Sequence, residues 1–377
     1  MHILFAGGGT AGHINPALAI AGFVKEKQPD AKISFIGTAN RLESRLVPEA
    51  GYDFYTIDVE GFQRSLSVKN IGRNLSAAYK AVKASHDARR LIERLRPDLV
   101  VGTGGYVSGP VVRQAQKLGI KTVIHEQNAY PGVTTKMLAE RADAVLLAMP
   151  EAERHLKLRS KPHITGNPVR RSVLSADRET ARRMLGVDGR PMILSFGGSL
   201  GARAINEASA DVIAWHWKTG SLFHFHGAGS SGYKDMQRLL AEKGVDLGRA
   251  PTVRFSEYIN DMDLCMAAAD LVICRAGAIT LSELEAQGKA AILIPSPYVA
   301  ENHQYHNAMT LADRGAAMVI EEKDLTGARL VEEVKNLVAA PARLREMGER
   351  AKAAAVPDTA ERIYAVLMDV YAREQHA

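Results

Sequence analysis

Three glycines near the start of the chain have the spacing of a phosphate-binding turn, and a histidine follows them directly. The stretch reads MHILFAGGGTAGHINPALAIAG, where Gly7, Gly9 and Gly12 lie between an apolar run and a helical pattern. Such a turn offers backbone N–H groups and the positive end of a helix dipole to an anionic ligand. A dinucleotide-binding turn does not require a histidine at position 13, so His13 needs a separate explanation.

The glycine motifs suggest two other kinds of site. A nicotinamide cofactor needs an acidic residue at the tip of the second strand, and the corresponding stretch, FIGTANR, has none. In the second half, Gly197, Ser199 and Gly201 match the G-x-S-x-G turn of serine hydrolases. The adjacent pair Gly197 and Gly198 equally suits close approach of the backbone to a phosphate. A hydrolase using Ser199 therefore stays open as an alternative.

Two further glycine turns point to a phosphorylated ligand. DLVVGTGGYVSGPVV and LVICRAGAITLSELEAQG each place small residues between a strand and a helix. Four such turns facing one crevice would bind a diphosphate without a lysine. Glu283, in the first turns of the last of these helices, either accepts hydrogen bonds from ribose hydroxyls or complements the helix dipole.

Short β-branched runs alternate with helical patterns along the chain, which indicates βα units and parallel sheets. We expect six strands in each half, at HILFA, KISFIG, FYTID, DLVVG, TVIHE and AVLLA, and then at PMILSF, LFHFHG, TVRFS, LVICR, AAILIP and AAMVI. This pattern predicts an α/β fold of two Rossmann-like, doubly wound domains. We expect the domains at residues 1–165 and 166–345, with a hinge near 162–168 and a C-terminal helix at 346–377 that packs back toward the N-terminal domain.

Composition and charge narrow the class of protein. The chain has 377 residues, 46% of them apolar and 24% charged, which suffices for two folded domains. Lys plus Arg exceed Asp plus Glu by 48 to 42, a weak preference for anionic partners. Cys265 and Cys274 lack metal-ligand spacing, and no apolar run approaches the ~18 residues of a membrane span. We therefore expect a cytosolic protein.

Seven motifs occur in order over almost the whole chain: GGGTAGHINPALAIA, GTGGYVSGP, HEQNAYPG, TGNPVR, FGGSLGA, RAGAITLSE and NHQYHNA. Together they resemble the MurG group of glycosyltransferase family 28. The resemblance implies a GT-B fold, in which the active site lies in a cleft between two Rossmann-like domains. It implies transfer of N-acetylglucosamine from UDP-N-acetylglucosamine to a lipid-linked muramyl-pentapeptide, with inversion at the anomeric carbon, no cofactor and no nucleic acid. A protein of the same fold that only binds or epimerises a nucleotide sugar is the remaining alternative.

The resemblance also assigns roles to individual residues. Those expected to contact UDP are Ile259 at the uracil, Glu283 at the ribose, Arg170 and Ser199 at the diphosphate, and the turn of Ala278, Ile279, Thr280, Leu281, Ser282 and Glu283. Those expected around the sugar are Gln304, Asn128, Thr10, Ala11 and Gly12, and those on the acceptor side are Gly104, Gly105 and Tyr106. Ala11 stands where glycine is more usual, and His303 stands where some relatives have glutamine.

The attacking hydroxyl must lose its proton during transfer, and two residues are candidates for the base. His13 titrates in the useful range, although it could instead cap its helix or bind a substrate group. Glu126, at a strand end, is the alternative base, and its other interpretation is an orienting or salt-bridging residue.

Asp261 and Asp263 form the D-x-D pattern that other glycosyltransferases use to hold a divalent ion. We interpret Asp261 as the cap of a helix that begins at Met262. Because helix dipoles and Arg170 can stabilise the leaving group, we expect that no metal is required.

A helical segment within residues 68–85 is the candidate membrane surface. Its apolar residues recur at helical spacing and basic residues surround them: Val68, Ile71, Leu75, Tyr79 and Val82 with Lys69, Arg73, Lys80 and Lys83. The pattern alone favours packing on the sheet, as for most amphipathic helices. The resemblance favours peripheral attachment to the anionic cytoplasmic face of the bacterial plasma membrane.

Overall fold

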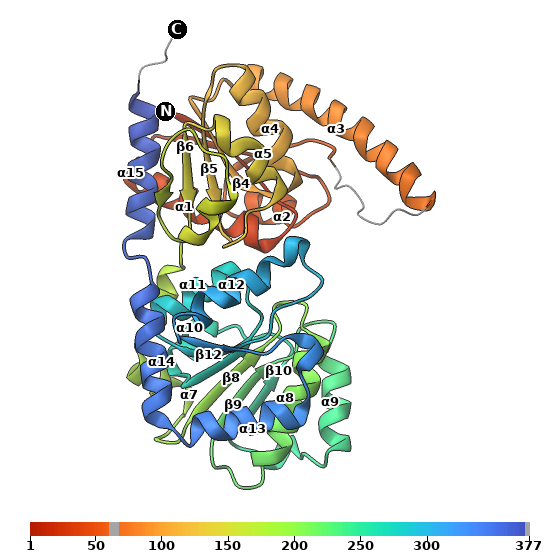
Figure 1. Cartoon of the computed structure of the whole chain (residues 1–377), viewed down its shortest axis with the longest axis vertical. Coiled ribbons are helices and arrows are strands. Elements are labelled where there is room, and N and C mark those ends of the chain that lie inside the picture. The colour runs from red at the N-terminus through yellow and green to blue at the C-terminus, as the bar shows by residue number, and fades with distance from the viewer. Residues whose placement is uncertain (60–67, 374–377) are drawn as a thin grey trace. The chain divides into compact units, whose positions relative to one another are not determined.

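The structure is a computed structural model of the chain that describes residues 1–59 and 68–373, with residues 68–81 described by their backbone alone (Figure 1). The chain forms two compact units. The first comprises Met1–Pro168 and Val356–Ala377, and the second comprises Val169–Ala355. Each unit is built on one parallel sheet, which confirms the predicted α/β class with two Rossmann-like domains.

The sheet of the first unit has seven strands in the order β3-β2-β1-β4-β5-β6-β7. Its strands are β1 (His2–Gly7), β2 (Lys32–Gly37), β3 (Asp53–Thr56), β4 (Leu99–Gly104), β5 (Lys121–Glu126), β6 (Ala144–Leu147) and β7 (His163–Ile164). All neighbours run parallel, with Ile3 paired to both Ile33 and Leu99. Every residue of β1 is buried, as expected for a central parallel strand covered on both faces.

The helices of the first unit lie between these strands in the sequence, apart from one that comes from the end of the chain. They are α1 (Ala11–Lys27), α2 (Glu43–Glu49), α3 (Val68–Leu95), α4 (Gly105–Lys117), α5 (Val133–Leu138) and, from the end of the chain, α15 (Thr359–Ala372). Short 3₁₀ turns lie at Ala139–Arg141 and Pro150–His155.

The sheet of the second unit has six strands in the order β10-β9-β8-β11-β12-β13. Its strands are β8 (Met192–Phe196), β9 (Phe223–Gly227), β10 (Val253–Ser256), β11 (Leu271–Cys274), β12 (Ala290–Leu293) and β13 (Ala317–Val319). Its helices are α6 (Arg171–Ser175), α7 (Arg178–Leu185), α8 (Arg203–His216), α9 (Tyr233–Glu242), α10 (Met262–Ala268), α11 (Ala278–Gln287), α12 (His303–Ala312), α13 (Gly327–Val338) and α14 (Pro341–Ala354), with 3₁₀ turns at Leu247–Arg249, Ala300–Asn302 and Glu322–Asp324.

Both sheets reverse their strand order beside their first strand. β1 lies between β2 and β4, and β8 lies between β9 and β11. In open parallel sheets, ligands bind outside the carboxyl ends of the strands at such a switch point. The loops after β1, β4, β8 and β11 are therefore where this rule places a ligand, and they are the four glycine turns predicted from the sequence.

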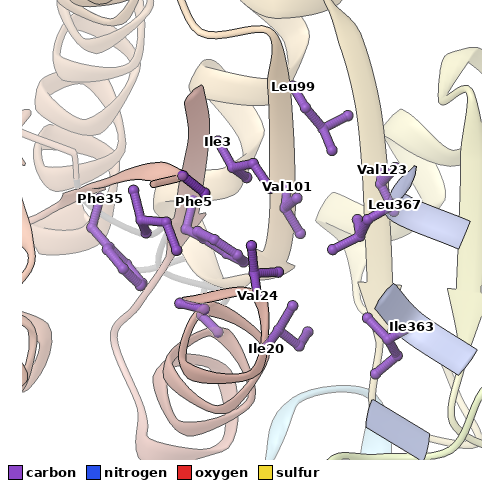
Figure 2. Close-up of a cluster of buried hydrophobic side chains, with 14 of the residues drawn as sticks. Ile3, Phe5, Ile20, Val24, Phe35, Leu99, Val101, Val123, Ile363 and Leu367 are labelled. Atoms are coloured by element: carbon purple, nitrogen blue, oxygen red, sulfur yellow. The ribbon is translucent and has the colours of Figure 1, made fainter. Parts of the chain in front are cut away.

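The last helix belongs to the core of the first unit. Ile363, Leu367 and Val370 of α15 lie in the same buried cluster as Phe5 and Phe35, whose rings stack at 5.1 Å. Figure 2 shows Leu367 beside Val123 of β5. The C-terminal segment therefore contributes apolar area to a sheet that was built mainly by the first part of the chain.

The predicted strands match the structure except at one place. All twelve predicted runs overlap a strand, and β7 is an additional one of two residues at the end of the first sheet. The region predicted as one C-terminal helix contains most of α14 and all of α15, separated by residues 355–358. Among residues 1–59 and 68–373, no helix is both long and apolar enough to cross a membrane.

Candidate active site

The first two glycine turns touch each other in the first unit. A Cβ atom added to Gly105 would lie 2.2 Å from the carbonyl oxygen of Gly8, and one added to Gly7 would lie 2.0 Å from Thr103 Oγ1. Gly104 and Gly105 also have φ angles of +104° and +80°. Glycine is therefore required here by both contact and conformation. Position 11, by contrast, begins helix α1, and its alanine needs no positive φ.

His13 is held by the first turn through one ring nitrogen. Its Nδ1 lies 3.1 Å from the carbonyl oxygen of Gly8 and 3.2 Å from Thr10 Oγ1. A carbonyl only accepts, so Nδ1 carries the proton and Nε2 keeps its lone pair. Within the described residues no hydrogen bond is made to Nε2, which packs beside the Cα of Gly104. This tautomer is the one that a general base acting through Nε2 requires.

The surroundings of His13 keep its imidazole neutral. Burial lowers the pKa of His13, while the charge of Glu126, the Gly8 carbonyl and the charge of Glu43 oppose that effect. The pKa remains below the ordinary value for histidine. The ring can therefore accept a proton at neutral pH.

Glu126, the alternative base, is occupied by hydrogen bonds. Its Oε1 accepts from the backbone N–H and from the Nδ2 of Asn128, both at 3.1 Å, and its Oε2 accepts from Gly132 N–H at 3.2 Å. The residue is 3% exposed. This arrangement suits an orienting residue that fixes the loop carrying Asn128. Tyr106, on the expected acceptor side, is 60% exposed at the start of α4.

The glycine turn after β8 is held by a second loop of the same unit. Gly198 and Gly201 have φ angles of +95° and +85°. The carbonyl of Ser199 accepts from Ser230 N–H at 3.2 Å, and a Cβ on Gly201 would lie 2.0 Å from the carbonyl oxygen of Ala228. The Ser199 hydroxyl is exposed and, within the described residues, bonds to no histidine, so the base that a serine hydrolase needs is missing there.

This turn opens onto a cavity of about 580 Å³, within the size range of small-ligand sites. The lining comes from the segments after β8, β11 and β12, from α8 and α12, and from the 3₁₀ turn at Glu322–Asp324: Gly197, Gly201, Ala202, Arg203, Ala204, Glu207, Arg275, Ser296, Tyr298, Gln304 and Glu322. Gln304 Oε1 accepts from Ser296 N–H at 2.8 Å, and Arg275 forms an ion pair with Glu322. The structure thus brings Gln304 together with the Gly197–Gly201 turn.

Arg170 and Glu283, both predicted to contact the donor, form an ion pair with each other. Arg170 Nε and Nη2 both lie 3.0 Å from Glu283 Oε1. Burial raises the pKa of Glu283, and the Arg170 guanidinium partly offsets this. In the turn that begins α11, Ala278, Leu281, Ser282 and Glu283 are buried, whereas Ile279 and Thr280 are partly exposed. The first-turn N–H groups of α11 are of the kind that binds anions.

The prediction for Asp261 was right in position and wrong in interaction. Asp261 is the N-cap residue of α10, but its side chain makes no capping bond. Its carboxylate instead receives two hydrogen bonds of 2.7 Å from Arg254. A guanidinium can donate to both carboxylate oxygens at once, so this bidentate interaction is stronger than the single hydrogen bond of a helix cap. Nearby Ile259 is 4% exposed, with its side chain against Gly227.

The candidate membrane segment lies largely outside the described side chains. Its backbone is helical, since α3 spans Val68–Leu95, but side chains of residues 68–81 are not described. Among the residues beyond them, Val82 is 72% exposed.

Sequence reasoning missed Glu43, a fully buried carboxylate in the first unit. It accepts from Gly9 N–H at 3.0 Å, Thr38 N–H at 3.1 Å and the Thr38 hydroxyl at 2.7 Å. The signal that could have found it is its place at the start of α2, the helix that follows the strand whose tip lacks an acidic residue. Burial raises the pKa of Glu43, but the bonds from Thr38 and Gly9 outweigh this and the pKa is lowered.

Comparison with known proteins identifies the family. Residues 3–147 match the glycosyltransferase family 28 N-terminal domain, and residues 192–363 match the glycosyltransferase family 28 C-terminal domain. A relative from Acetivibrio thermocellus, named UDP-N-acetylglucosamine–N-acetylmuramyl-(pentapeptide) pyrophosphoryl-undecaprenol N-acetylglucosamine transferase, is 44% identical over 371 residues, covering 98% of each chain.

One solved structure supports the same family, and a second shows the same fold. The crystal structure of MurG from Acinetobacter baumannii matches with a TM-score of 0.79 and 32% identity, covering 98% of this chain and 99% of that one. A UDP-N-acetylglucosamine 2-epimerase from Neisseria meningitidis matches with a TM-score of 0.67 over 98% of this chain and 100% of its own, but at 11% identity this likeness shows the fold alone. On the two domain matches and the near full-length identity, the chain belongs to glycosyltransferase family 28.

Proposed function

We propose that this protein transfers N-acetylglucosamine from UDP-N-acetylglucosamine to the 4-hydroxyl of the muramic acid in undecaprenyl-diphospho-muramyl-pentapeptide, a step of peptidoglycan synthesis. The name of the 44% identical relative describes transfer of N-acetylglucosamine between UDP-N-acetylglucosamine and N-acetylmuramyl-(pentapeptide) pyrophosphoryl-undecaprenol. The structural observation that carries the proposal is His13, a neutral imidazole whose Nε2 lone pair is free beside two glycine turns at a switch point. A transferase that activates a hydroxyl needs such a group.

The transfer is a single displacement that inverts the anomeric carbon. The acceptor oxygen forms a bond to that carbon while the bond from the carbon to the UDP oxygen breaks, and UDP leaves with the electron pair. His13 Nε2 takes the acceptor proton. Glu126 orients the loop that carries Asn128 rather than acting as the base, because both of its oxygens already accept hydrogen bonds.

In this proposal the second unit holds most of the donor, and the first unit holds the acceptor and contributes residues to the sugar pocket. The diphosphate lies at the Gly197–Gly201 turn and the start of α8, where N–H groups and the helix dipole offset its charge. Gln304 and Asn128 bind sugar hydroxyls, Ile259 contacts the uracil and Glu283 the ribose. Arg170 exchanges part of its bond to Glu283 for the diphosphate and stabilises the charge that develops on UDP. We propose that no metal ion is required.

We further propose that the protein attaches peripherally to the cytoplasmic face of the plasma membrane, where the lipid-linked acceptor is found. The basic residues Lys69, Arg73, Lys80 and Lys83 of α3 would meet anionic headgroups there. Replacing all four with glutamate should release the protein from anionic vesicles and leave its affinity for UDP-N-acetylglucosamine unchanged. Unchanged vesicle binding would exclude this helix as the attachment surface.

The decisive assay incubates the protein with labelled UDP-N-acetylglucosamine, the lipid-linked muramyl-pentapeptide and a chelator. Formation of the disaccharide lipid is expected, and His13→Ala should lower kcat by about 10²–10⁴-fold. Conversion of the nucleotide sugar without acceptor would indicate an epimerase instead. Labelling of Ser199 by a fluorophosphonate would indicate a hydrolase.

A further inference from the structure

We propose that Glu43 is a positioning residue for the reaction: its buried carboxylate braces the Gly8–Gly9 turn, and through the Gly8 carbonyl it fixes the tautomer and orientation of His13. This inference rests on the proposed function for its catalytic consequence. Its structural part concerns the first unit alone.

The carboxylate backs both residues of the turn. Glu43 Oε2 accepts from Gly9 N–H at 3.0 Å. A Cβ added to Gly8 would lie 2.5 Å from Glu43 Cδ, so the Cα of Gly8 rests directly against the carboxyl group. Gly9 has a φ of +85°, one of several conformations open to glycine, and the bond to Glu43 favours this one.

The carboxylate is itself held rigidly. Oε1 accepts from the N–H and the hydroxyl of Thr38, at 3.1 Å and 2.7 Å, and Glu43 is 0% exposed. Three donors converge on one buried anion, and such charge-assisted bonds are among the stronger ones in proteins. Thr38 directly follows β2, and the turn follows β1, so the two neighbouring strands place the donors on either side of Glu43.

The turn held by Glu43 in turn holds the ring of His13. The Gly8 carbonyl oxygen accepts from His13 Nδ1 at 3.1 Å, and this bond selects the tautomer with a free Nε2. The same logic operates where a carboxylate or carbonyl orients a histidine that must present its other nitrogen. The charged groups that face His13 are Glu43 from α2 and Glu126 from β5.

Glu43→Gln is the informative substitution because it keeps the size of the side chain. A carboxamide has one acceptor oxygen, so its NH₂ group must face either Gly9 N–H or Thr38 N–H. Two donors then face each other, and one hydrogen bond is lost. Glu49→Gln is the matched control, since Glu49 lies on the same helix α2 and is exposed.

The first measurement is ¹⁵N NMR of protein labelled at histidine, with the His13 signals assigned by comparison with His13→Gln. In the wild type, Nδ1 should carry the proton and Nε2 should not. In Glu43→Gln the tautomers should mix, whereas Glu49→Gln should match the wild type. This measurement needs no substrate, so it tests the positioning of His13 even if the proposed transfer is absent.

The second measurement is the pH dependence of kcat in the transfer assay. Glu43→Gln should lower kcat by about 10–100-fold, by analogy with other groups that orient a functional histidine. Loss of the negative charge should also move the acidic limb to lower pH. Thr38→Val removes one donor but keeps the negative charge of Glu43, so it should lower kcat by a smaller factor and leave the acidic limb in place. This variant covers the case in which Glu43→Gln fails to fold. A folded Glu43→Gln with the wild-type tautomer, or a tautomer change without loss of kcat, would overturn the proposal.

Discussion

At the scale of single residues, Gly104 is where the backbone meets the proposed base. An alanine Cβ at this position would lie 2.7 Å from Cδ2 and 3.1 Å from Nε2 of His13, and the φ of +104° disfavours any side chain. We expect Gly104→Ala to displace the imidazole and lower kcat in the transfer assay by at least about 10²-fold, as misplacement of a reacting group does. Steady-state kinetics on the purified variant would measure this loss.

The strain of a left-handed residue must be separated from the displacement of His13. Gly119 offers the comparison, because its φ is +72° and an added Cβ would meet nothing within 4 Å. Gly119→Ala should lower the free energy of unfolding by about 1–2 kcal/mol, which is similar to the backbone strain expected for Gly104→Ala. The kcat of Gly119→Ala should stay at the wild-type value. Equal losses of kcat in both variants would show that Gly104 acts through stability alone.

At the scale of elements, the sequence predicted the strands and turns that leave a local pattern of residues. The buried strands appear as apolar runs, and the turns after β1 and β8 appear as glycine clusters. β7 was missed because two partly buried residues, His163 and Ile164, have no periodicity.

Side-chain partners were harder to predict than strands. Glu43 meets Gly9 only because β1 and β2 pair, and the Arg254 guanidinium lies within reach of Asp261 only once β10 and α10 have folded. Such partners depend on tertiary structure, and residue spacing in one sequence does not reveal them.

A chain of buried polar side chains links β8, β9 and α8 in the second unit. The Ser195 hydroxyl lies 2.7 Å from His224 Nε2 and 2.7 Å from His226 Nδ1, and His216 Nε2 lies 3.4 Å from His224 Nδ1. Asn206 Oδ1 lies 3.2 Å from His226 Nε2. Because Asn206 Nδ2 donates to a backbone carbonyl, Asn206 Oδ1 must accept from His226 Nε2. With all three histidines neutral, this fixes the position of every proton in the hydrogen-bonded series.

These histidines should make the second unit sensitive to acid. Burial lowers the pKa of His216 to about 4 and of His226 to about 3, and burial together with the neighbouring histidines lowers the pKa of His224 well below 6.5. The unfolded chain binds these protons below about pH 6.5 and the folded unit does not, so stability falls as the pH drops from about 6.5 toward 4. Each histidine should contribute a slope of about 1.4 kcal/mol per pH unit in that window.

The test follows urea unfolding by tryptophan fluorescence between pH 4.5 and 8. Both tryptophans of the chain, Trp215 and Trp217, lie in the second unit, so the signal reports on that unit alone. His216→Gln keeps a donor for His224 Nδ1 but removes one titrating group, and should reduce the slope by about one proton. A slope identical to that of the wild type would show that His216 does not contribute to the pH dependence of stability.

At the scale of the whole molecule, the chain leaves the first unit at Pro168 and returns to it at Val356. The return supplies α15, whose Ile363 and Leu367 are 1% and 0% exposed within the core around β1 and β5. The first unit is therefore completed only after the second has been synthesised, and its stability depends on the last residues of the chain. Removing one of these side chains should weaken one unit and leave the other unchanged.

Leu367→Ala tests this division. Loss of a fully buried leucine side chain should lower the free energy of unfolding of the first unit by about 2–5 kcal/mol, because a cavity opens beside Val123. Hydrogen exchange measured by mass spectrometry should show faster exchange in peptides from β1 and β5, while the tryptophan transition of the second unit stays at its wild-type position. Glu361→Ala, at an exposed position on the same helix, controls for changes in helix propensity and should alter neither signal. If the tryptophan transition shifts together with the exchange of β1 and β5, the two units unfold as one, and α15 then stabilises the whole chain rather than the first unit alone.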